Sequence, residues 1–196
     1  MVSDREVFRA ITDALDYRKI SASTGLTESQ IRDFLLRTEK RFWRAEVKDK
    51  GGFDKLVINV DGASRGNPGP AAAGVLIRDA DGAEIDSFGR LLGETTNNAA
   101  EYMALILAIE RASEFGAKSV KILTDSEILK KQLSGEYRVK SPNLVILHGK
   151  AEKALASFKK WEVELVPRAQ NAEADALANI ALDKAKKAAP KKTGGA

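Results

Sequence analysis

The sequence predicts an α/β domain with a mixed five-stranded sheet flanked by helices, preceded by a small all-α domain. Three observations support this fold class. From Lys55 onward, apolar and polar side chains alternate with the period of two that is typical of strands. Three strand-like segments then come before alternating helical and strand-like segments, in the order βββαβααβα. Before the pair Gly51-Gly52, by contrast, the apolar spacing is helical.

Residues 1–50 are expected to form a helical domain. Val7, Ile11 and Leu15 recur at helical spacing, and Gly25 interrupts the pattern before a second apolar segment at residues 31–35. Two helices separated by a glycine turn are the simplest structure with this pattern.

The second helix of this domain carries a start signal, with Thr27 as the N-cap and Gln30 three residues later. Ser21, Gly25 and Ile31 also have the spacing of a helix-turn-helix motif. Plain helical hairpins share that spacing, so contact with nucleic acid, contact with protein and neither role all remain open. The basic residues that would favour nucleic acid are Arg37, Lys40, Arg41 and Arg44.

The remaining boundaries follow from composition and periodicity. We expect a linker at 51–54, the α/β domain at 55–186 and a disordered basic tail at 187–196. Strands are expected at 55–61, 73–77, 84–91, 120–124 and 161–166, and helices at 97–115, 126–133, 142–158 and 172–186. Three strands in a meander followed by helical crossovers imply a mixed sheet with helices on its faces.

Composition excludes several classes of protein. The 196 residues are 43% hydrophobic, which excludes a wholly disordered chain. The sequence contains no run of about 18 apolar residues, the length needed to span a membrane. Because no apolar signal core follows Met1, we expect a cytoplasmic protein. Cysteine is absent and His148 is the single histidine, so thiolate nucleophiles and cysteine-ligated zinc are excluded. Catalysis would rest on carboxylates, hydroxyls, amides or lysines.

The net charge of +4 is unevenly distributed along the chain. Residues 1–52 carry 11 basic and 9 acidic side chains, whereas residues 53–183 carry 16 basic and 19 acidic ones. The last 13 residues contain five lysines and no acid. An acidic main domain suits a nucleic-acid-binding protein only if some of its acids hold metal ions.

Four acidic residues stand out by their places in the predicted fold. Asp61 is expected to end the first strand and Asp125 the fourth, while Glu101 and Asp175 are each expected one turn into a helix. If the first and fourth strands are parallel neighbours, their carboxylates meet at one sheet edge, where open α/β sheets bind ligands. Oxygen ligands without His or Cys suit a hard cation such as Mg²⁺. Taken singly, each acid also fits a turn or a helix cap.

The segments around these acids carry a resemblance. They read DGASRGNPGP at 61–70, TTNNAAE at 95–101, TDS at 124–126 and NAEAD at 171–175. In this order they resemble the signature blocks of type 1 ribonuclease H, and the predicted element order matches that fold over roughly residues 55–185.

The resemblance implies a ribonuclease H-like mixed sheet and an endonuclease that cuts the RNA strand of RNA–DNA hybrids. It further implies two Mg²⁺ ions, with Mn²⁺ as a substitute. Asp61 would bridge both ions, Glu101 and Asp125 would complete one site, and Asp175 would complete the other. Two such ions stabilise the attacking and leaving oxygens of a phosphodiester displacement.

The same resemblance implies residues that contact the hybrid. Thr96 and Asn98 match the family's pocket for a phosphate of the DNA strand. Amides that both donate and accept near the cut site suit recognition of the 2′-hydroxyl, which distinguishes RNA from DNA. The expected set is Gly62, Ser64, Arg65, Asn67, Thr96, Asn97, Asn98, Glu127, Arg168 and Asn171.

Three departures from the family pattern bear on these expectations. Many members carry a histidine in the loop before the last aspartate, whereas Arg168 stands in the expected loop 167–171 and cannot act as a base near neutral pH. His148 is expected to pack on a helix instead. Glu127 replaces a common glutamine, and residues 134–141 are too few for the long basic handle of some relatives.

The sequence therefore favours a two-metal endoribonuclease acting on RNA–DNA hybrids. Two alternatives stay open: a non-catalytic nucleic-acid-binding protein that uses its N-terminal helices, and the same nuclease acting also on double-stranded RNA. Four acids gathered at one edge argue against the first, because a scaffold has no need to collect like charges.

Overall fold

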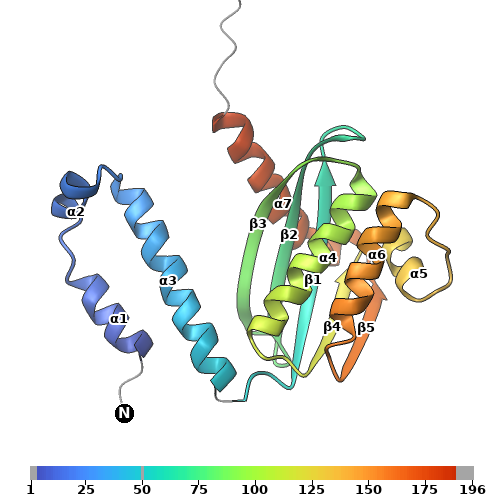
Figure 1. The fold of residues 1–196 in the computed structure, drawn as a ribbon, viewed down its shortest axis with the longest axis horizontal. Coiled ribbons are helices and arrows are strands. Elements are labelled where there is room, and N and C mark those ends of the chain that lie inside the picture. Colours follow the sequence, from blue (N-terminus) through green and yellow to red (C-terminus); the bar gives the residue numbers. More distant parts are fainter. Residues whose placement is uncertain (1–3, 50, 189–196) are drawn as a thin grey trace, which may run out of the picture. The chain divides into compact units, whose positions relative to one another are not determined.

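The computed structural model describes residues 4–49 and 51–188 (Figure 1). The chain divides into two compact units, one formed by the N-terminal helices through Gly52 with residues 114–116, the other by residues 53–113 and 117 onward. No helix in the described residues combines the length and apolar character needed to cross a membrane. The predicted tail at 187–196 lies almost wholly outside the described residues.

The first unit contains three helices, α1 (Asp4–Asp13), α2 (Tyr17–Thr24) and α3 (Glu28–Asp49). Gly25 ends α2 in the left-handed conformation, with φ of 71°, and its N–H donates to the carbonyl of Ser21. The start signal of α3 is confirmed: the Thr27 N–H donates to Gln30 Oε1 at 2.8 Å, and the Gln30 N–H donates to Thr27 Oγ1 at 3.3 Å.

These helices bury few of their described apolar side chains completely. Of the side chains described on α1, α2 and α3, only that of Ile31 is buried. Phe8 of α1 contacts Phe42 of α3, with ring centroids 5.3 Å apart. The unit also includes Phe115, which is fully buried, with its ring centroid 5.4 Å from that of Trp43. Two buried apolar side chains among the described residues still make a small internal core, since small domains depend on burying a large part of their apolar area.

The second unit is built on a five-stranded sheet in the order β3-β2-β1-β4-β5. Its strands are β1 (Lys55–Ser64), β2 (Gly69–Asp79), β3 (Glu84–Thr95), β4 (Ser119–Thr124) and β5 (Lys160–Leu165). The first three pair antiparallel, whereas β1 with β4 and β4 with β5 pair parallel. The predicted mixed sheet and the order βββαβααβα are confirmed.

Helices cover both faces of this sheet. They are α4 (Asn97–Glu114), α5 (Glu127–Leu133), α6 (Pro142–Leu155) and α7 (Arg168–Ala188). α4 and α6 lie on one face, and α7 packs across β1, β2 and β3 on the other (Figure 1). The core between these layers includes Ile58, Val60, Ile77, Leu105 and Ile122, all fully buried.

α7 approaches the sheet closely because the facing positions are small. A Cβ on Gly74 of β2 would overlap the carbonyl oxygen of Ala174. Gly74 therefore lets the backbones of β2 and α7 come together.

Several element ends differ from the sequence-based expectations, including those of β1, which runs to Ser64, and α6, which ends at Leu155. β2 and β3 extend beyond the expected 73–77 and 84–91, since they pair with each other from Gly69 and Thr95 down to the hairpin. α7 begins at Arg168, so the expected loop at 167–171 is wrong. Pro167 accepts a hydrogen bond from the Gln170 N–H at 2.8 Å and starts the helix, as proline is well suited to do.

Candidate active site

The pairing of β1 determines where Asp61 lies. β1 pairs with β4 only as far as Asn59 opposite Leu123, but with β2 it continues to Ser64. Asp61 is thus inside β1 rather than at its end, and that expectation is wrong. Beyond the last residues of β4, however, the β4 side of β1 is open, so Asp61 still reaches the carboxyl-terminal edge. Asp125 directly follows β4, as expected.

Glu101 is brought to the same edge by a close approach of α4 and β1. A Cβ on Gly62 would overlap the backbone of Ala100 and Glu101, so only glycine fits there. The Gly62 N–H donates to Glu101 Oε2 at 3.1 Å. The Glu101 side chain is thereby aimed at the strand that carries Asp61.

Asp175 reaches the site from α7. Because this helix begins at Arg168, Asp175 lies two turns into it rather than the expected one turn. Asp175 directly follows Ala174, whose carbonyl faces Gly74, and Gly74 is paired with Asp61 across the β1–β2 ladder. The close packing of α7 on β2 therefore sets the place of Asp175 relative to Asp61.

All four predicted carboxylates line one cleft of about 600 Å³. They come from four different elements or element ends, so the tertiary fold alone brings them together. The other residues that line the cleft are Gly62, Ala63, Ser64, Asn97, Asn98, Ser126, Glu127, Ile128, Arg168 and Asn179.

Burial and the neighbouring negative charges disfavour ionisation of two carboxyls in the cleft. Asp61 and Glu101 are only 7% and 6% exposed. Burial, reinforced by the charges of Asp125 and Asp175, raises the pKa of Asp61 from 3.8 to about 6, while Arg168 opposes the rise. Burial, reinforced by Asp61 and Asp125, raises the pKa of Glu101 from 4.5 to about 9, against a lowering by the Gly62 N–H. Both carboxyls would ionise more readily beside a cation.

The chain itself places donors on the other two carboxylates. Asn171 Nδ2 donates to Asp125 Oδ1 at 2.8 Å, and Arg168 Nη2 donates to Asp175 Oδ1 at 3.1 Å. Within residues 4–49 and 51–188, no group of three or more acidic, His or Cys side chains takes a ready coordinating arrangement. The donor set nevertheless fits a hard cation, since it consists of four carboxylates, two of them buried with raised pKa.

Asn171 differs from its expected role as a substrate contact. Its side chain is buried; its Nδ2 also donates to the Val60 carbonyl at 2.9 Å, and its Oδ1 accepts from Asn59 Nδ2 at 3.1 Å. With both polar atoms engaged inside the protein, Asn171 positions Asp125 relative to β1. The sequence motif singled out Asn171 as a site residue, and its burial favours a role in positioning Asp125 over direct contact with substrate.

Six of the other predicted substrate-contacting residues line the cleft: Gly62, Ser64, Asn97, Asn98, Glu127 and Arg168. Glu127 forms a hydrogen-bonded ion pair with Lys131, which balances its negative charge. This hydrogen bond raises the pKa of Lys131.

Besides Asn171, three predicted contacts are not among the cleft-lining residues. Arg65 forms an ion pair with Asp183 of α7. Asn67 Oδ1 accepts from the Asn97 N–H at 3.2 Å, and Thr96 Oγ1 accepts from the Ala99 N–H at 3.3 Å. Asn67 and Thr96 therefore stabilise the start of α4, which presents Asn97 and Asn98 to the cleft.

The sequence analysis did not single out Asn179, which also lines the cleft. Asn179 Nδ2 donates to Asp175 Oδ2 at 3.2 Å and to the Asp175 carbonyl at 3.0 Å. The signal was present, because residues four apart on a helix are neighbours. An asparagine four residues after a candidate ligand is expected to hold that ligand.

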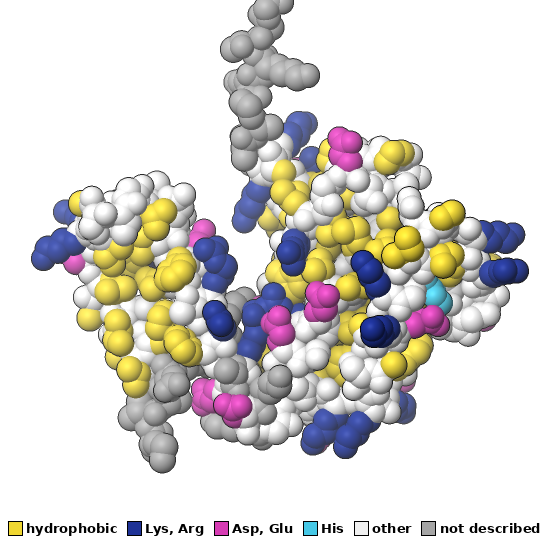
Figure 2. Space-filling view, in the orientation of Figure 1, with side chains coloured by type: hydrophobic (Ala, Val, Ile, Leu, Met, Phe, Trp, Pro, Cys, Tyr) yellow, Lys and Arg dark blue, Asp and Glu magenta, His cyan; other side chains and the backbone are white. Residues whose placement is uncertain are grey.

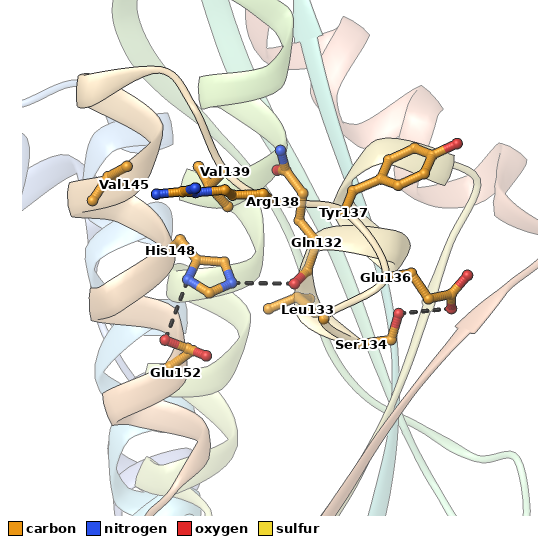
Figure 3. A pocket seen from close by; sticks show the side chains of 11 residues that line it. Gln132, Leu133, Ser134, Glu136, Tyr137, Arg138, Val139, Val145, His148 and Glu152 are labelled. Atoms are coloured by element: carbon orange, nitrogen blue, oxygen red, sulfur yellow. Dashed lines mark hydrogen bonds and ion pairs between the residues drawn. The ribbon is translucent and has the colours of Figure 1, made fainter.

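A second groove, of about 650 Å³, lies between α6 and the loop that joins α5 to α6 (Figure 3). His148 lines this groove, with Nε2 3.3 Å from the Gln132 carbonyl and Nδ1 3.2 Å from Glu152. The expected packing role of His148 is confirmed, and the carboxylate cleft contains no histidine, since this is the only one in the chain.

Known proteins share both the fold and much of the sequence. A family described as "Reverse transcriptase-like" matches residues 59–181. Ribonuclease HI of Halobacterium salinarum is 44% identical over 137 residues, covering 70% of this chain and 68% of the relative. The chain belongs to the ribonuclease HI family. This family consists of metal-dependent nucleases, and its assignment agrees with the cleft of four carboxylates.

Solved ribonuclease HI structures support this assignment. The crystal structure of the Halobacterium salinarum enzyme superposes with a TM-score of 0.65, at 44% identity, and covers 66% of this chain and 98% of that one. LC11 ribonuclease H1, crystallised in complex with an RNA/DNA hybrid, gives 0.64 at 40% identity, covering 67% and 99%. A bifunctional protein of Mycobacterium tuberculosis is 41% identical over 136 residues. The matched segment is 69% of this chain but only 37% of that relative. The family match does not include the N-terminal helices.

Proposed function

We propose that this protein hydrolyses the RNA strand of RNA–DNA hybrids in a reaction that requires divalent metal ions. The observation that carries the proposal is the convergence of Asp61, Glu101, Asp125 and Asp175 on one cleft, with two of the four buried. Burying like charges together costs folding free energy, so a fold that does so uses them. The hybrid bound to LC11 ribonuclease H1 supports the choice of substrate.

The same four carboxylates would hold the metal, which we propose to be two Mg²⁺ ions with Mn²⁺ as a substitute. When bound, such ions supply Lewis-acid stabilisation of the attacking and leaving oxygens. The protein fixes the positions and orientations of the four carboxylate side chains. Gly62 orients Glu101 through its N–H, Asn171 orients Asp125, and Asn179 orients Asp175.

The remaining cleft residues are placed to bind the nucleic acid. Asn97 and Asn98 open α4 and carry amides that donate and accept, which suits recognition of a 2′-hydroxyl beside the cut site. Arg168 is 79% exposed at its side chain and supplies a permanent positive charge at the mouth. Since this guanidinium keeps its proton at neutral pH, we assign it to binding phosphate rather than to accepting a proton.

A substrate panel tests the proposal. Labelled RNA–DNA hybrid, double-stranded RNA and double-stranded DNA are incubated with the full chain in Mg²⁺, in Mn²⁺ and in EDTA. We expect cleavage of the RNA strand of the hybrid with either metal and none in EDTA. Cleavage of double-stranded RNA would widen the substrate class, and persistence of cleavage in EDTA would contradict the proposal.

Asp125→Asn provides the matched inactive variant, because it keeps the size and shape of the side chain while removing its charge. We expect a loss of at least about 100-fold, since a ligand charge at a two-metal site contributes several kcal/mol to the transition state. A variant that folds normally and retains more than about a tenth of the rate would argue against these ligands.

The domain boundaries are also proposed rather than tested. We propose that residues 1–50 and 55–186 are separate domains joined by a linker at 51–54. Limited proteolysis of the full chain should then cut first in or next to this linker. Preferential cutting inside either domain would contradict this division. The cytoplasmic location also stays a prediction.

A further inference from the structure

The N-terminal helices present an apolar face that their own unit does not cover. Five side chains define this face: Val7, Phe8, Ile11, Phe34 and Phe42. Figure 2 shows hydrophobic side chains gathered over α1 and α3. Val7 and Ile11 are one turn apart on α1, Phe34 and Phe42 are two turns apart on α3, and the Phe8–Phe42 contact joins the two helices.

The exposure of this face is large for side chains of this kind. Val7 is 47%, Ile11 55%, Phe34 58% and Phe42 38% exposed. With about 150 Å² as an average for each whole side chain, these four leave roughly 300 Å² of apolar surface in water. A contiguous apolar patch of several hundred Å² on a small unit marks an interaction site.

We infer that this apolar face binds the same face of a second copy of the chain and makes the protein a homodimer. A standard interface buries about 800 Å² on each partner, of which a little over half is apolar. The roughly 300 Å² exposed here is about two thirds of that apolar share. Each copy would thereby complete the core of the other around Ile31, the one buried side chain described on these helices.

Charge also fits a second copy better than a nucleic acid. Residues 1–52 contain 11 basic and 9 acidic side chains, so two copies meet with little repulsion. A polyanion would be bound by a larger excess of basic side chains than the two of residues 1–52, and the five side chains that define the face are uncharged. A two-fold axis pairs identical patches and closes the assembly at two copies. This inference concerns the N-terminal unit and does not depend on the proposed nuclease activity.

Sedimentation of the full chain tests the inference. A dimer has twice the mass of the 21.2 kDa chain and dissociates on dilution. Ile11→Ser and Phe34→Ser should each raise the dimer dissociation constant at least about 100-fold, because the two-fold axis presents every substitution twice. The matched control is Leu36→Ser: Leu36 is 55% exposed, but it lies about 200° around α3 from Phe34, on the opposite side. The control should leave the dissociation constant unchanged.

Cross-linking gives a second test that does not require removal of apolar side chains. The chain has no cysteine, so single cysteines report on one position each. Thr38→Cys lies between Phe34 and Phe42 on the same side of α3 and should form a cross-linked dimer with a short bis-maleimide. Ser29→Cys, on the side of Leu36, should not. A full chain that stays monomeric at about 100 µM, or equal cross-linking from both positions, would overturn the inference. If added hybrid protects a cysteine on this face from reaction with the maleimide while the protein stays monomeric, the inference would likewise be overturned and the face assigned to nucleic acid.

Discussion

In the metal-free protein, the buried carboxyl of Glu101 should make stability fall as pH rises. The native state keeps this proton up to a pH of about 9, whereas an unfolded chain releases it near 4.5. Between these values the native state binds about one proton more than the unfolded state. Stability therefore decreases with rising pH across this window, and the stabilising effect of the proton is lost at the native pKa.

The magnitude follows from one proton. A difference of one bound proton changes the free energy of unfolding by about 1.4 kcal/mol per pH unit. Between pH 6.5 and 8.5 the expected loss is about 2.7 kcal/mol. Asp61 contributes its own fall between 3.8 and about 6, so the chosen window isolates Glu101.

Urea unfolding followed by circular dichroism measures this slope, in EDTA and at several pH values between 6.5 and 8.5. Glu101→Gln keeps the shape of the side chain and cannot titrate, so its stability should be nearly flat over the window. Glu110→Gln is the matched control, since Glu110 is an exposed residue of the same helix and should retain the wild-type slope. Saturating Mg²⁺ should flatten the wild-type slope, because a cation favours the ionised carboxylate.

Two results would refute this reasoning. If Glu101→Gln and the wild type lose stability equally between pH 6.5 and 8.5, the protein does not hold a proton on Glu101. If added Mg²⁺ leaves the wild-type slope unchanged, the carboxyl is not part of a cation site.

Three further substitutions test the packing that supports the cleft and the first helix unit. Gly74→Ala should cost about 2–3 kcal/mol of stability and reduce cleavage, because the added Cβ would meet α7, which carries Asp175. The control Gly149→Ala, in an open helical position, should be neutral or stabilising. Equal losses of stability for the two variants in urea unfolding would contradict the close packing of α7 on β2. Asn171→Ala should cost about 1–3 kcal/mol and lower kcat at saturating hybrid, and an unchanged kcat would remove its positioning role. Thr27→Ala should lower the stability of the N-terminal helices by about 1 kcal/mol, and thermal melts with no shift would argue against the capping box.

The order of the elements could be predicted because it depends on local patterns. The alternation from Lys55, the capping pair at Thr27 and Gln30 and the parallel pairing of β1 with β4 all follow from spacing and connectivity. The four carboxylates of the cleft could also be located, since their sequence blocks are distinctive and they line one cleft.

The remaining details depend on contacts that no local pattern shows. Asp61 looked like a strand end because glycines and a proline follow it, yet β2 continues to pair with β1 beyond it. The start of α7 was expected later because the family resemblance placed a loop at 167–171. Asn171 matched a substrate-binding position, and only its burial among Asn59, Val60 and Asp125 shows that it holds a ligand in place.

The contribution of α7 to the cleft has a consequence for the newly made chain. This helix carries Asp175 directly and, through Asn171, also holds Asp125. Synthesis on the ribosome proceeds from the N-terminus, so β1, α4 and β4 emerge before the helix that completes the ligand set. Until α7 has docked, the ligand set is incomplete, because Asp175 is not in the cleft and Asp125 lacks its donor from Asn171. Docking of α7 on Gly74 of β2 is therefore the folding event that completes the cleft.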